Sequence, residues 1–171
     1  MADCLKIGIS SCLLGNDVRY DGGHSRSDII IESMSDLFEL IPFCPEVAIG
    51  MTVPRPTINL IAINGEIRVR GVSNISHDVT DALSHYAISI TKQLNEMCGY
   101  IFKSRSPSCG LDMVNVYDEA GAVVGVSAGQ FAKIITQQHP ELPTVDEVNL
   151  LEKEMRDNFI QRVVSYSKKN N

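Results

Sequence analysis

The chain has 171 residues, 44% of them hydrophobic, and a formal net charge of -6 at pH 7. This is enough for one ordinary domain with a buried core, so we expect residues 1–171 to form a single domain. There is no apolar run of membrane-spanning length and no export signal, and the acidic balance disfavours a broad nucleic-acid-binding surface. A cytoplasmic protein that binds neither membranes nor long nucleic acids is expected.

Short apolar runs and helical patterns alternate along the first half of the chain. Residues 5–9 and 40–43 have the composition of buried strands, and residues 27–38 have the spacing of a helix that starts at an N-cap serine. The Asn-Gly pair at 64–65 divides residues 59–70 into two strands, which is typical of a type I′ hairpin.

The second half continues the alternation. Apolar residues at helical spacing predict an amphipathic helix over residues 79–97, ended by Gly99. Strands are expected at residues 100–103 and 113–117, and a further helix is expected from Ser127.

The C-terminal part shows a helix-start pattern. Thr144 and Glu147 match a capping box, which predicts a terminal helix with an apolar stripe. The stripe consists of Val148, Leu151, Met155, Phe159 and Val163. Strands that alternate with helices indicate an α/β protein, and we expect a three-layer Rossmann-like architecture with a mainly parallel sheet and one β-hairpin.

Three of the five cysteines share a position relative to the predicted strands. Cys12, Cys44 and Cys109 each follow the carboxyl end of a strand, where ligands bind in open α/β sheets, so they could meet at one edge. An odd number of cysteines without an export signal makes a disulfide framework improbable. We interpret Cys4 and Cys98 as structural.

Several kinds of cysteine chemistry are compatible with this pattern. A zinc ribbon would need closely spaced thiol pairs, which are absent, and a nucleophilic cysteine would need a histidine that the sequence does not place beside it. Iron-sulfur clusters are held by thiolates, and three thiolates would leave one iron open to bind a substrate atom. Three unrelated buried cysteines remain an alternative.

An ordered series of short motifs, within residues 5–135, resembles the thiouracil desulfurase (desulfidase) family, long catalogued as a domain of unknown function. The motifs are Ser11-Cys12-Leu13-Leu14-Gly15, Val18-Arg19-Tyr20-Asp21-Gly22, Cys44-Pro45-Glu46, Val53-Pro54-Arg55-Pro56, Asp78-Val79-Thr80 and Ser106-Pro107-Ser108-Cys109-Gly110. The resemblance implies a 4Fe-4S cluster, bound by three cysteines with one iron open to the substrate sulfur, that converts thiolated uracil to uracil.

The resemblance also implies roles for particular residues. The cluster ligands would be Cys12, Cys44 and Cys109, while Glu46 and Ser108 would form an acid/base and proton-relay pair. The expected partner is a small thiolated pyrimidine, as base, nucleoside or nucleotide. A weak homodimer is one oligomeric state that the sequence leaves open.

Four charged residues near these motifs are candidate substrate-binding groups. Arg19 and Asp21 would contact the pyrimidine or fix their loop, and Lys103 and Arg105 would hold a phosphate or balance the charge of the cluster. Two other functions stay open: a non-catalytic cluster or thiol redox sensor, which would not need Glu46, and a metal-free pyrimidine-binding domain.

Overall fold

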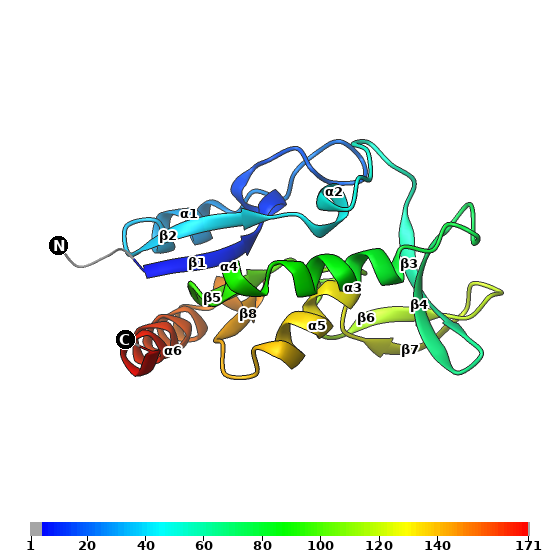
Figure 1. Ribbon diagram of the computed structural model, residues 1–171. Coiled ribbons are helices and arrows are strands. Elements are labelled where there is room, and N and C mark those ends of the chain that lie inside the picture. Colours follow the sequence, from blue (N-terminus) through cyan, green and yellow to red (C-terminus); the bar gives the residue numbers. More distant parts are fainter. Residues whose placement is uncertain (1–4, 171) are drawn as a thin grey trace.

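The computed structural model describes residues 5–170, and its first sheet is entirely parallel (Figure 1). The strand order is β2-β1-β5-β8. The strands are β1 (Leu5–Ser10), β2 (Phe38–Phe43), β5 (Met97–Phe102) and β8 (Thr144–Asp146). β1 and β5 are adjacent although about half of the chain separates them, so residues distant in sequence meet at the carboxyl edge of this sheet.

Helices cover both faces of the first sheet. Alternate strand side chains point to opposite faces, so Ile7 and Ile101 pack against one helix pair and Tyr100 and Phe102 pack against the other helices. The first face carries α1 (Asp28–Met34) and α6 (Lys153–Asn170), and the second carries α3 (Thr80–Ser89), α4 (Thr91–Leu94) and α5 (Gln130–Gln138). This three-layer arrangement confirms the predicted α/β class.

A second, mixed sheet lies beyond the first, with the strand order β4-β3-β6-β7. Its strands are β3 (Ile58–Ile63), β4 (Glu66–Gly71), β6 (Val114–Tyr117) and β7 (Val123–Ser127). The hairpin at Asn64 and Gly65 is confirmed, and both residues have the positive φ, 51° and 81°, that a type I′ turn requires. β6 and β7 form a second antiparallel pair in addition to the one predicted.

The predicted helix over residues 79–97 is wrong in its second part. The helical segment divides into α3 and α4, and β5 begins at Met97, so Gly99 lies inside a central strand instead of ending a helix. A Cβ on Gly99 would lie 2.8 Å from Val163 of α6, so this glycine lets a helix approach the sheet. β5 is buried on both faces, so its sequence is a continuous apolar run without polar alternation. The apolar spacing predicted for the helix therefore continued into the strand.

The capping box at Thr144 and Glu147 is also wrong. Thr144 belongs to strand β8, and Glu147 binds a loop of the first sheet instead of capping a helix. The terminal helix starts later, at Lys153, after η2 (Asn149–Leu151), a short 3-10 turn. Of the predicted apolar stripe, Phe159 and Val163 are buried, whereas Val148, Leu151 and Met155 are exposed.

Two other boundaries differ from the sequence prediction. β2 begins at Phe38, which removes the end of the first predicted helix, and Ser127 ends β7 instead of starting a helix. Cys98 is half-buried beside the core, as its structural interpretation requires, whereas Cys4 lies outside the described residues. Within residues 5–170, no helix has both the length and the apolar character needed to cross a bilayer.

Candidate functional site

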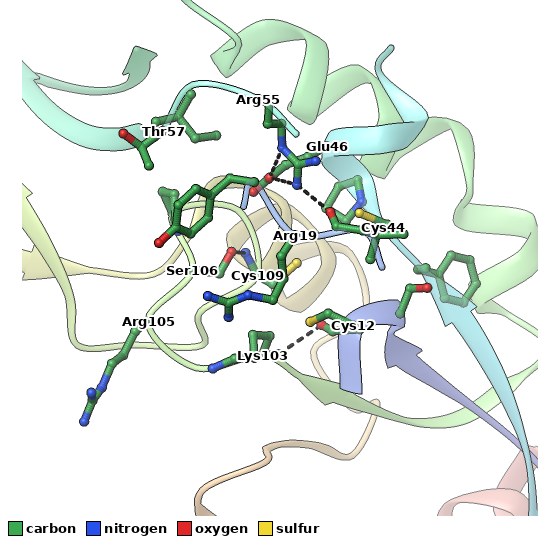
Figure 2. A pocket seen from close by; sticks show the side chains of 18 of the residues that line it. Cys12, Arg19, Cys44, Glu46, Arg55, Thr57, Lys103, Arg105, Ser106 and Cys109 are labelled. Carbon is green, nitrogen blue, oxygen red and sulfur yellow. Dashed lines mark hydrogen bonds and ion pairs between the residues drawn. The ribbon is translucent and has the colours of Figure 1, made fainter. Parts of the chain in front are cut away.

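The three strand-end cysteines line one cavity of about 430 Å³ (Figure 2). Cys12 lies in η1 (Ser11–Leu14), directly after β1, and Cys44 is the N-cap of α2 (Pro45–Ala48), directly after β2. Cys109 lies in the loop that follows β5. Because β2, β1 and β5 are adjacent and parallel, their carboxyl ends bring the three thiols to the same edge.

These thiols sit in surroundings that disfavour their charged form. Burial raises the pKa of Cys12 to about 11, and it also raises the pKa of Cys44 and, further, of Cys109. A negative charge on Cys44 would raise the pKa of both Cys12 and Cys109, and a negative charge on Cys12 would raise the pKa of Cys109. Three thiolates here would therefore need a cationic partner.

Across residues 5–170, no three His, Cys, Asp or Glu side chains are arranged to hold a metal ion. Cys12, Cys44 and Cys109 line the cavity without forming such a group.

Glu46 connects two of the cysteine-bearing segments. It lies in the first turn of α2, two residues after Cys44, and its carboxylate is 13% exposed. Ser108, which is fully buried and precedes Cys109, donates a hydrogen bond of 2.8 Å from its hydroxyl to Glu46 Oε1. The structure thus brings the predicted acid/base pair into direct contact beside the thiols.

Arg55 is a site residue that the sequence analysis did not assign. Its Nε donates to Glu46 Oε2 at 2.8 Å, and its Nη2 donates to the same oxygen. The guanidinium is only 4% exposed and also donates to the backbone carbonyl oxygens of Val18 (2.8 Å) and Thr52 (3.2 Å). An arginine between two prolines, shortly after the Cys-Pro-Glu motif, was the signal available in the sequence.

The loop between β1 and α1 contributes Arg19 to the cavity wall. Asp21 does not line the cavity, and its carboxylate instead accepts hydrogen bonds of 3.3 Å from Nε and Nη2 of Arg19. Ser25 accepts a third hydrogen bond, of 2.7 Å, from Nη1. The Arg19 hydrogen bonds hold the pKa of Asp21 below its ordinary value, so Asp21 remains an anion that orients Arg19.

The loop after β5 carries the other two predicted cations. Lys103 Nζ lies 2.5 Å from Glu147 Oε1, and the backbone N–H of Ser104 donates to Glu147 Oε2 at 2.6 Å. Burial raises the pKa of Glu147, but these hydrogen bonds outweigh burial and lower it overall. Glu147 follows β8, the fourth parallel strand, and so meets the same edge.

Arg105 differs from Lys103 in having an exposed side chain that points away from the cysteines (Figure 2). It forms no hydrogen bond or ion pair with the described part of the chain, and its φ is 61°. Arg105 lines both the cysteine cavity and a neighbouring cavity of about 360 Å³ beside β6. It therefore lies between the two cavities.

The sequence as a whole matches a known family. The model of the family described as 2-thiouracil desulfurase matches residues 7–147, which include all three cysteines of the cavity. The chain belongs to the 2-thiouracil desulfurase family. The resemblance inferred from the short motifs is therefore confirmed.

The chain is also similar to two known proteins. A solved structure of the 4Fe-4S-dependent thiouracil desulfidase TudS is 29% identical, with a TM-score of 0.63, and the match covers 90% of this chain and 98% of that one. The uncharacterized protein YbbK of Bacillus subtilis (strain 168) is 28% identical over 148 residues, or 82% of this chain and 96% of YbbK. Both matches extend over nearly the whole of the relative.

Proposed function

We propose that this protein is an iron-sulfur-dependent desulfidase that converts thiolated uracil to uracil and sulfide. The observation that carries the proposal is the hydrogen bond from buried Ser108 to Glu46, a residue that lines the same cavity as the thiols of Cys12, Cys44 and Cys109. The family and the similarity to TudS support this class of enzyme. The substrate would be 2-thiouracil or 4-thiouracil, or the corresponding thiouridine nucleoside or nucleotide.

The thiols fit a 4Fe-4S cluster with three protein ligands. Cys12, Cys44 and Cys109 come from three separate strand ends and line one cavity, and thiolates are the ligands that hold iron-sulfur clusters. When bound, the cluster would supply an iron with an open position, a Lewis acid with affinity for the departing sulfur. The cationic side chains of Arg19 and Lys103 on the same wall would offset the negative charge of thiolates.

The net reaction is a hydrolysis, so it needs no oxidant or reductant. The oxygen of one water forms a bond to the thiocarbonyl carbon, the carbon–sulfur bond breaks, and both protons of that water leave with the sulfur as hydrogen sulfide. Glu46 would accept the first proton from the attacking water. The Ser108 hydroxyl, which donates to Oε1, would pass a proton between this carboxylate and the departing group.

Other cavity residues would bind the rest of the substrate. We assign Arg19 to the pyrimidine, with Asp21 as its orienting partner, because two carboxylate hydrogen bonds fix its guanidinium beside the thiols. Lys103 and Arg105 would bind a phosphate if the substrate is a nucleotide, Arg105 being the better placed because its side chain is not engaged elsewhere in residues 5–170.

We place the protein in the cytoplasm, where thiols remain reduced. Cys12, Cys44, Cys98 and Cys109 are all free thiols in the described residues, as cluster ligands must be before assembly.

The test is anaerobic reconstitution with iron and sulfide, followed by turnover of thiouracil, thiouridine and thiouridine monophosphate. We expect bound iron, uracil and hydrogen sulfide, and we expect Cys12→Ser, Cys44→Ser and Cys109→Ser each to lose both the cluster and turnover. Cys98→Ser is the matched control and should keep both. A protein that binds iron without turnover would be a redox module instead, and one that binds pyrimidine without iron would be a metal-free binding domain.

A further inference from the structure

Tyr100 carries a buried hydroxyl that the fold leaves without a partner. It lies in the middle of β5 and is 0% exposed, and its hydroxyl oxygen forms no hydrogen bond in the described structure. Buried polar groups are nearly always hydrogen-bonded, because leaving one unpaired costs the full desolvation penalty of the group. A phenylalanine would fill the same space without that penalty. The presence of the hydroxyl therefore suggests a hydrogen-bond acceptor that residues 5–170 themselves do not provide.

The ring of Tyr100 lies toward the end of the sheet that bears the thiols. Its centroid is 4.2 Å from that of Phe102 and 5.7 Å from that of Phe43. Phe102 is the last residue of β5, and Phe43 is the last residue of β2, immediately before Cys44. Tyr100 and Cys109 also belong to the same buried cluster.

The neighbouring strand makes room for this ring placement. A Cβ on Gly8 of β1 would lie 2.4 Å from Tyr100 Cδ2 and 3.3 Å from Phe43 Cε2. The ring therefore lies across the bare backbone of β1, between the two strands that carry Cys44 and Cys109.

The charges that act on this hydroxyl come mainly from the cavity thiols. After burial, which raises the pKa of Tyr100 most, the further causes are Cys109, Tyr86, Cys44 and Cys12. All three proposed cluster ligands are thus among the groups that influence the hydroxyl. A sulfur acceptor at the inner wall of the cavity would satisfy it.

We propose that the Tyr100 hydroxyl donates a hydrogen bond to a sulfur atom of the cluster or of its cysteine ligands, as a positioning residue behind the site. This inference rests on the proposed function, because it needs the cluster. Outer-shell hydrogen bonds to metal-bound sulfur stabilise the bound group and raise its reduction potential. Tyr100 would retain and tune the cluster without touching the substrate.

The experiment compares Tyr100→Phe with the unaltered protein in two states, free of iron and anaerobically reconstituted with iron and sulfide. Without iron, Tyr100→Phe should have the same melting temperature or a higher one, because an unpaired hydroxyl is removed. With the cluster, it should lose iron to a chelator faster, by about tenfold on the scale of outer-shell substitutions. Its cluster should also have a lower reduction potential, measured by dye-coupled titration.

Tyr166→Phe is the matched control. Tyr166 packs against the same buried cluster from α6, and the cysteine that influences it is Cys98, which is not a proposed ligand. This variant should leave iron release and potential unchanged.

The possible results separate the inference from the proposed function. Equal destabilisation of the iron-free and reconstituted forms by Tyr100→Phe, or unchanged iron release and potential, would overturn the inference while the cluster stands. Failure of the unaltered protein to take up iron would overturn both.

Discussion

The Ser108 hydroxyl lies 2.8 Å from Glu46 Oε1 and joins the loop after β5 to the helix after β2. The opposite carboxylate oxygen is held by Arg55. Glu46 therefore has one oxygen fixed by a cation and the other in contact with a hydroxyl that can exchange a proton.

Glu46→Gln should abolish most turnover while preserving the cluster. The amide keeps the size of the side chain but cannot act as a general base, a contribution of about 10²–10⁴-fold to the rate. The measurement is kcat of the reconstituted variant, normalised to bound iron. Turnover within a factor of about two of the unaltered enzyme would remove Glu46 from the acid/base role.

Ser108→Ala should lower kcat more than it changes KM, because the hydroxyl contacts Glu46 and is not part of the cavity wall. Ser33→Ala is a control, since Ser33 bonds only the backbone of α1. A Ser108→Ala enzyme with normal kcat and raised KM would show that the hydroxyl serves binding and not proton transfer.

Arg55→Met should destabilise the protein even in the absence of iron. The change leaves a carboxylate with 13% exposure without its cation, and breaking such a buried pair costs about 3–5 kcal/mol of the free energy of unfolding. Denaturant unfolding of the iron-free protein measures this loss of unfolding free energy. In the double variant with Glu46→Gln the loss should be clearly smaller than the sum of the two single losses, whereas simple additivity would show that the pair contributes no coupling.

Gly8→Ala should disturb the core around Tyr100. The added methyl would lie 2.4 Å from a ring atom, and overpacking of this kind costs about 1–3 kcal/mol in unfolding free energy. Gly125→Ala provides the comparison, because a Cβ at that position of β7 meets nothing within 4 Å. Equal stabilities of the two variants, measured by denaturant unfolding, would contradict the described placement of the Tyr100 ring.

Asp78 should contribute stability that is lost in acid. Burial raises its pKa, but hydrogen bonds from Arg68 (2.9 Å), Thr80 (3.0 Å) and Arg70 (3.0 Å) outweigh burial and hold the pKa well below its ordinary value. Because the folded-state pKa is below that of the unfolded chain, the contribution is complete at neutral pH and declines as pH falls through the aspartate range.

The test is Asp78→Asn in iron-free protein. The variant should be less stable at neutral pH, and its deficit should shrink as pH is lowered below about 5. Asp81→Asn, whose carboxylate is 73% exposed, should show a much smaller deficit. A deficit for Asp78→Asn that stays constant down to acid pH would mean that the charge of Asp78 does not support the fold.

The sequence could locate the candidate site because a general rule connects strand ends to binding edges. Cys12, Cys44 and Cys109 could be assigned to one edge from the predicted strands alone, and all three line the cavity. Arg55 and Glu147 could not be assigned in this way. Arg55 acts through contacts with Glu46 and a distant backbone carbonyl, and Glu147 lies after a three-residue strand too short to show an alternating pattern.

The wrong boundaries at β5 and at Thr144 also arose because the contacts that decide them are distant in sequence. Central parallel strands are buried on both faces, so β5 has no polar alternation to separate it from the helix before it. Thr144 similarly has the composition of a helix cap, but the pairing of Val145 with Ile101 places this segment in the sheet. Tertiary pairing, which local sequence does not encode, decided both positions.

The adjacency of β1 and β5 also sets an order of events during synthesis. β1 carries Cys12 on the first part of the chain to be made, whereas β5 and Cys109 emerge only after the intervening β2, β3 and β4. Until β5 pairs with β1, the cavity lacks one wall and Glu46 lacks Ser108. A ribosome-bound chain that stops before β5 therefore cannot form the site, and a cofactor that needs all three thiols can be inserted only after Cys109 has been made.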